Sequence, residues 1–205
     1  MKKGYLLIGF MIMVMATICN AEMEKVQFLP SESAVKKFDF IENYSLNSLV
    51  VVGSKSPALD VVSACDIASA LGSLTVPYVE TSYPEESFEY MNVVITLVKT
   101  EITKEISLLK TPISRLDTEL TPEDFENYNL ILVGGPKVNI LVHELQEEGK
   151  LPFNITAEKP GPGKGAVMFL DNPYGTGKDV LIVAGSDREG TREASLALFN
   201  LILKN

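Results

Sequence analysis

The sequence predicts an α/β fold, a layered domain in which helices cover a mixed, largely parallel sheet. The first observation is an apolar run followed by glycine, which occurs at residues 49–53, 130–135 and 180–185. Each run is rich in Val, Ile and Leu without alternation, which is typical of strands buried on both faces. The second observation is that helix-like segments follow the glycines, so the runs predict βα units.

The first unit joins the strand at 49–52 to a helix over 58–71. Ser56 is the expected N-cap, and Gly72 is expected to end the helix. Its apolar residues recur at helical spacing, which predicts a face packed on the sheet. The residues at this spacing are Val61, Val62, Cys65, Ala68 and Leu71, and the small residues Ala64, Ala68 and Ala70 are expected to allow close packing on the sheet.

The middle of the chain carries weaker signals. Residues 35–40 (VKKFDF) predict an edge strand, and residues 92–99 (NVVITLVK) predict a strong strand. Residues 81–89 contain Pro84 and three acids and are expected to form a loop.

The C-terminal third predicts a helix, a hairpin and a second helix. The helix is expected over 138–148 and is followed by strands at 166–170 and 180–184. The short connection between these strands requires antiparallel pairing, because a parallel crossover needs about a dozen residues or more. A helix over 188–203 closes the domain, so the sheet is expected to be mixed.

Residues 1–21 resemble a signal peptide rather than part of the fold. Lys2 and Lys3 precede an apolar run at 5–18, and the sequence Cys19-Asn20-Ala21 suits cleavage between Ala21 and Glu22. The run is shorter than the roughly 20 residues of a spanning helix, so no stable anchor is expected after cleavage. Lipidation of Cys19 and a pilin-type leader remain alternatives. Residues 22–205 are then expected to form a single domain.

The composition excludes several function classes. The formal net charge is −9, which argues against nucleic acid as a partner because nucleic-acid binding needs clustered Lys and Arg. An acidic chain suits a secreted protein that meets cations. No cofactor is expected, although a structural divalent cation such as Ca²⁺ fits this charge.

The sequence offers no recognisable catalytic set. Cys65 has Ala64, Ile67 and Ala68 nearby in the sequence and is expected to be a buried hydrophobe. The only histidine, His143, is expected on a helix surface. A Ser-His-Asp triad or a histidine-based metal site is therefore not predicted, and we expect no enzyme.

The glycine turns do not match the known phosphate-binding patterns. None carries G-x-G-x-x-G or G-x-x-x-x-G-K-[ST] at the required place. Because ligands bind at the carboxyl ends of parallel strands, the candidate interaction turn comprises Gly134, Gly135, Asp187, Arg188 and Glu189. Packing and local charge pairing are the alternative role of these residues. An open polar pocket at the strand ends would favour ligand binding, whereas ends capped by the chain itself would favour a structural role.

Two N-glycosylation sequons occur in predicted loops. They are Asn43-Tyr44-Ser45 and Asn154-Ile155-Thr156. In an exported protein, Asn43 and Asn154 are therefore candidate glycosylation sites.

Three segments resemble archaeal S-layer proteins of the methanococcal and thermococcal type. Val133-Gly134-Gly135-Pro136 with Asn139 resembles the family's VGGP-x-x-N motif. Residues 172–191 (NPYGTGKDVLIVAGSDREGT) are similar to its most recognisable stretch, and residues 50–74 resemble its N-terminal strand–helix unit. Family members are usually several times longer, so this chain corresponds to roughly one module.

The resemblance implies an exported, non-catalytic cell-surface protein that assembles with itself or with other envelope proteins and is often glycosylated. Two alternatives come from the residues themselves. One is an extracellular domain that binds a glycan or another small molecule at the strand ends. The other is an exported enzyme that uses carboxylates such as Asp187 and Glu189.

Overall fold

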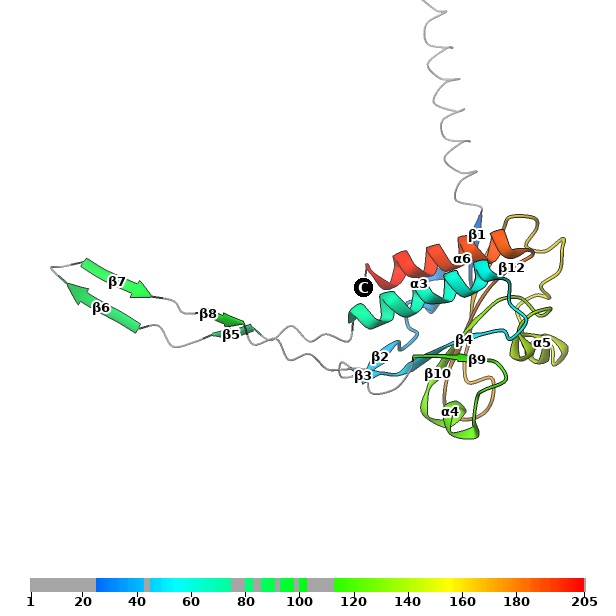
Figure 1. Cartoon of the computed structure of the whole chain (residues 1–205), viewed down its shortest axis with the longest axis horizontal. Coiled ribbons are helices and arrows are strands. Elements are labelled where there is room, and N and C mark those ends of the chain that lie inside the picture. Colours follow the sequence, from blue (N-terminus) through cyan, green and yellow to red (C-terminus); the bar gives the residue numbers. More distant parts are fainter. Residues whose placement is uncertain are drawn as a thin grey trace, which may run out of the picture.

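A six-stranded sheet forms the centre of the molecule (Figure 1). The computed structural model describes residues 25–42, 45–74, 80–82, 86–90, 93–97, 100–102 and 113–204. The strand order is β1–β11–β12–β10–β4–β9, and only the β11–β12 pair in this sheet is antiparallel. The strands are β1 (Val26–Leu29), β4 (Ser48–Val52), β9 (Ser114–Leu116), β10 (Asn129–Val133), β11 (Gly165–Leu170) and β12 (Val180–Gly185). The predicted mixed, largely parallel sheet is confirmed.

Helices cover both faces of this sheet (Figure 1). On one face, α3 (Ala58–Leu74) and α6 (Arg188–Ile202) pack side by side, with α2 (Glu32–Val35) near β1. On the other face lie α4 (Pro122–Asn127) and α5 (Ile140–Glu147). Successive β4 side chains alternate between the layers: Val50 and Val52 join the α3–α6 core, and Leu49 and Val51 join the α5 core.

The packed face of α3 differs from the predicted one. Val61 and Val62 are 44% and 48% exposed, and Cys65 is also exposed. The buried residues are Asp60, Ser63, Ala64, Ile67, Ala70 and Leu71. The prediction is confirmed for Ala64, Ala70 and Leu71. It was wrong for Val61, Val62 and Cys65, because α3 is apolar on most of its surface and the spacing of apolar residues does not single out one face. Gly72 lies within α3 and does not end it.

The predicted edge strand at 35–40 is also wrong. Ser31 caps α2 by accepting a hydrogen bond from the Ala34 N–H, and Val35 is the last residue of that helix. Phe38 and Phe40 are buried, with ring centroids 4.8 Å apart in an edge-to-face arrangement. Their apolar character therefore serves the core, and β1 takes the sheet edge beside β11.

Three smaller antiparallel pairs complete the described strands. They join β2 (Ile41–Glu42) to β3 (Ser45–Leu46), β5 (Glu80–Ser82) to β8 (Thr100–Ile102), and β6 (Glu86–Tyr90) to β7 (Val93–Leu97). The strand predicted at 92–99 is confirmed as β7. The loop predicted at 81–89 is wrong at residues 81–82, which belong to β5, and at residues 86–89, which belong to β6 and pair with β7. Residues 83–85 lie outside the described residues.

The helices of the described residues are too short or too polar to cross a membrane. The predicted final helix is confirmed as α6, and His143 lies on the exposed side of α5, as predicted.

Candidate functional site

The three repeated segments become neighbouring parallel strands. β10 pairs with β4 on one side and with β12 on the other, in register from Leu130 to Val133. Their carboxyl ends therefore meet at one edge of the sheet, which is where open α/β sheets bind ligands. This edge is the candidate site.

The glycines at this edge allow backbones to approach closely. A Cβ atom on Gly53 would lie 2.1 Å from the Val138 carbonyl oxygen. A Cβ atom on Gly185 would lie 2.4 Å from the carbonyl carbon of Gly190, in the first turn of α6. No side chain fits at either position, so these two glycines are required by packing alone.

Asp117 connects two of the turns. Its Oδ1 accepts a hydrogen bond of 2.7 Å from the Ser54 N–H, and its Oδ2 accepts one of 2.8 Å from the Ile140 N–H. The side chain follows β9 and is buried. Sequence reasoning missed Asp117, because nothing local relates it to residues 54 and 140.

Asn139 caps α5 and joins it to the sheet. Its Oδ1 accepts from the Leu141 N–H at 3.1 Å, and its Nδ2 donates to the carbonyls of Val51 and Val133 at 3.3 and 3.2 Å. The side chain is completely buried. Asn139 comes just before an apolar helical segment, which is an N-cap signal. This signal was not used to predict the cap of α5 from the sequence.

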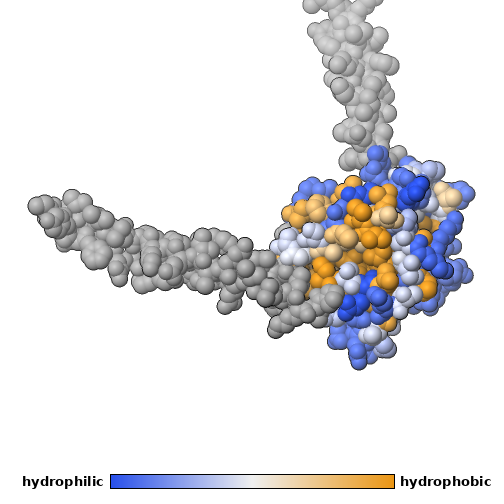
Figure 2. Space-filling view, viewed as in Figure 1, coloured by the Kyte–Doolittle hydropathy of each residue, from blue (hydrophilic) through white to orange (hydrophobic). Residues whose placement is uncertain are grey.

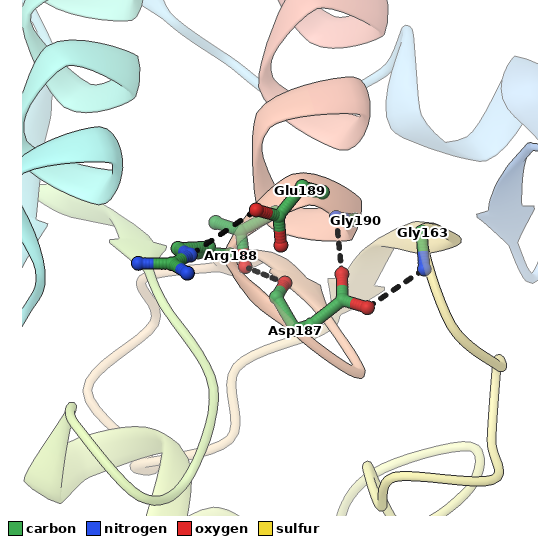
Figure 3. Close-up of polar contacts among 6 residues, drawn as sticks. Gly163, Asp187, Arg188, Glu189 and Gly190 are labelled. Atoms are coloured by element: carbon green, nitrogen blue, oxygen red, sulfur yellow. Dashed lines mark hydrogen bonds and ion pairs between the residues drawn. The ribbon is translucent and has the colours of Figure 1, made fainter.

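Asp187 caps α6 and fastens a distant loop to it (Figure 3). Its Oδ1 accepts from the Gly190 N–H at 2.7 Å, and its Oδ2 accepts from the Gly163 N–H at 2.8 Å. Arg188 and Glu189 form an exposed ion pair of 3.1 Å beside it. Both Asp187 oxygens are thus engaged, and Glu189 pairs with Arg188 rather than with Asp187.

A pocket opens between these turns. Of the predicted interaction turn, Gly135, Asp187 and Arg188 line it, whereas Gly134 and Glu189 are not among its lining residues. The rest of the lining comes from the start of α3, the Pro136 turn, the loop after α5, the end of β12 and the start of α6. These residues are Pro57, Asp60, Pro136, Lys137, Val138, Ile155, Thr156, Ala157, Gly185, Ser186 and Thr191.

Asp60 is the functional candidate that sequence reasoning missed. The residue is 2% exposed, and its Oδ1 has no hydrogen-bond partner. Burial raises the pKa of this carboxyl to about 6. The hydroxyl of Ser56 is buried and has no partner either, so the predicted N-cap bond is not made.

Ligands for a metal ion are few at this edge. Within the described residues, no three His, Cys, Asp or Glu side chains are grouped so as to hold a metal ion. The edge therefore offers one unpaired carboxylate, that of Asp60, besides carboxylates that the chain already uses.

The remaining predicted site residues lie elsewhere. Asn154 is exposed in the loop after α5, where its side chain is accessible. The Oγ1 atom of Thr156, in the same sequon, accepts from the Glu158 and Lys159 N–H groups. Asn43, Ala21 and Glu22 lie outside the described residues.

Comparison with known proteins gives consistent matches. The model of the S-layer like family, outer domain, matches residues 33–202. An S-layer protein of Methanothermococcus thermolithotrophicus is 44% identical over 94 residues, which cover 46% of this chain and 15% of that protein. An S-layer protein of Methanocaldococcus jannaschii is 41% identical over 101 residues, or 49% of this chain and 16% of that protein. An uncharacterised protein of the same organism is 46% identical over 70 residues, or 34% of this chain and 16% of that protein. The matched segments thus span about one sixth of these relatives.

Proposed function

The chain belongs to the S-layer like family, outer domain, and from this membership we propose that it is an exported, non-catalytic structural module of an archaeal cell surface. Because the chain belongs to this family, it is a cell-surface protein. The observation that carries the proposal is the family match over residues 33–202, which takes in the whole six-stranded sheet except β1.

The bonding at the strand ends supports the non-catalytic role. Asp117, Asn139 and Asp187 are polar side chains at the edge where an α/β enzyme would bind its substrate. Each is bonded to the chain's own backbone. The same groups hold the turns together, which is what a rigid surface module requires.

We propose that the module contacts other chains through its α3–β9 face, defined by Val61, Cys65 and Ala68 on α3 and Leu116 on β9. These residues line one shallow groove, and β9 is the edge strand of the sheet. Figure 2 shows apolar residues gathered on the side of the molecule where α3 lies. An exposed apolar groove beside a sheet edge is a surface that proteins use for association. The proposed occupant is another copy of this chain or another envelope protein of the same family.

Export and glycosylation complete the proposal. Residues 1–21 are proposed to be removed between Ala21 and Glu22, and Asn43 and Asn154 to carry glycans. Support at Asn154 comes from its exposure, because a glycan there displaces no core residue.

The proposal is tested by expressing the full chain in an archaeal host, separating envelope from soluble fractions, and imaging the envelope with and without Ca²⁺. We expect the protein in the envelope fraction, with its N-terminus at Glu22, within ordered arrays. A chain that is monomeric in every condition and absent from the envelope would refute the structural role.

A further inference from the structure

Asp60 is a buried acid for which the fold provides no hydrogen-bond donor at Oδ1. It occupies the third position of α3, from which an acidic side chain commonly reaches back to the N–H of the capping residue. That residue is Pro57, which has no N–H to donate. A buried carboxylate without a partner is unfavourable, so its presence points to a group from outside the chain.

The Ser56 hydroxyl and the Asp60 carboxylate lie on the same side of Gly134. Asp60 Oδ2 and Ser56 Oγ are each 3.3 Å from the position that a Cβ atom on Gly134 would occupy. Both side chains therefore converge on the same small region beside the end of β10. Asp60 lines the pocket, so a ligand in the pocket can supply the donor that Asp60 Oδ1 lacks.

The surroundings define the charge of that ligand. Four charged residues line the pocket, and Asp187 uses both carboxylate oxygens within the chain. Lys137 and Arg188 lie at the exposed rim, where Arg188 pairs with Glu189 and neither forms an ion pair with Asp60. A cation is favoured at the buried acid and an anion at the basic rim. A ligand that carries both charges satisfies both places.

We propose that this pocket binds a small zwitterion of the amino acid class, with its ammonium group on Asp60 and its carboxylate toward Lys137 and Arg188. The cavity of about 140 Å³ has room for a small amino acid. Pro136, Val138 and Ile155 supply apolar walls for a short side chain. A single carboxylate is a poor site for Ca²⁺, which takes six to eight oxygen ligands.

This binding goes beyond the structural role proposed above and does not depend on it. Both are compatible with one module, because the pocket lies at the strand ends and the α3–β9 face lies on the outer side of α3.

The test is calorimetric titration of the full chain, in the form that its host processes, with L-alanine, ethylammonium, propionate and Ca²⁺ at pH 7.5. We expect saturable binding of L-alanine, weaker binding of ethylammonium, and no binding of propionate. Asp60→Asn should weaken L-alanine binding at least tenfold, and Lys137→Gln should reduce the advantage of L-alanine over ethylammonium. Glu126→Gln, an exposed acid on α4, is the matched control and should bind like the wild type.

Affinity should also fall about tenfold for each pH unit below the pKa of Asp60, because the ammonium group then competes with a proton. Three results would overturn the proposal. They are an absence of L-alanine binding at 10 mM, equal binding by Asp60→Asn, and binding of Ca²⁺ alone that Asp60→Asn removes. Tighter binding of ethylammonium than of L-alanine would overturn the zwitterion assignment.

Discussion

The carboxylate of Asp60 lies against Gly134, with Oδ2 3.3 Å from the position that a Cβ atom on that glycine would occupy. This contact brings the first turn of α3 to the end of β10. At the same edge, Asp117 and Asp187 use both of their carboxylate oxygens to hold backbone N–H groups. The edge therefore contains two acids that hold the fold together and one that does not.

The unpaired acid makes stability depend on pH. Burial raises the pKa of Asp60 to about 6, whereas the unfolded value is 3.8. Between pH 3.8 and pH 6, the native state therefore keeps a proton that the unfolded state has released. Its contribution to the free energy of unfolding is then expected to fall as pH rises through this window, by on the order of 3 kcal/mol. Urea unfolding at pH 4, 5, 6 and 7 measures it. Asp60→Asn should remove this component, and a variant whose pH profile runs parallel to that of the wild type would refute it.

Removing the α6 cap should destabilise the fold. Asp187→Ala loses the acceptors for the Gly190 and Gly163 N–H groups, and the expected cost is about 1–2 kcal/mol in the free energy of unfolding. Glu189→Ala is the matched control, since it removes only an exposed ion pair and should cost less than about 0.5 kcal/mol. Chemical denaturation compares them, and equal losses would contradict the capping role.

Two glycines should respond to alanine in opposite directions. Gly53→Ala places a methyl group against the Val138 carbonyl, so we expect a loss of more than about 2 kcal/mol in the free energy of unfolding. Gly72 lies within α3, and among the described residues a Cβ atom there meets nothing within 4 Å beyond its chain neighbours and the nearby backbone of α3. Gly72→Ala should therefore stabilise the protein by up to about 1 kcal/mol. Thermal and urea unfolding of both variants test this, and a tolerated Gly53→Ala would disprove the close packing.

The Cys65 thiol reports on the α3–β9 face. It is exposed, so a thiol reagent such as dithiobis-nitrobenzoate should label it in the folded, unassembled protein. Assembly through this face should slow the labelling at least tenfold. The Cys65→Ser variant is the control, because any labelling that it still shows comes from Cys19. Unchanged labelling in assembled material would show that another face makes the contacts.

The buried strands were predictable from their continuous apolar runs, whereas the packed face of α3 was not. Short runs of Val, Ile and Leu at β4, β10 and β12 allow few structures other than a buried strand, because such a segment must be covered on both sides. In α3, apolar residues occur around the whole helix. Val61, Val62 and Cys65 suited the sheet as well as Ala64 and Ile67 did, and tertiary packing decided between them.

The polar side chains at the strand ends were predictable only in part. Asp187 comes two residues after β12 and directly before α6, so its position at the start of α6 could be predicted from the local sequence. Asp117 bonds to residues 54 and 140, and Asp60 lies against Gly134. These relations join segments more than 20 residues apart, and local patterns carry no information about them. The site's geometry therefore emerged only with the fold.

We propose that this module works at the cell surface through its outer α3–β9 face. Incorporation into the envelope tests it most directly, using the wild type, Val61→Lys and the matched control Ile140→Lys. The two wild-type side chains are 44% and 42% exposed, on helices that cover opposite faces of the sheet. We predict that wild type and Ile140→Lys enter ordered envelope arrays while Val61→Lys stays soluble and folded. Equal incorporation of all three chains, or none of the wild type in the envelope, would contradict the account.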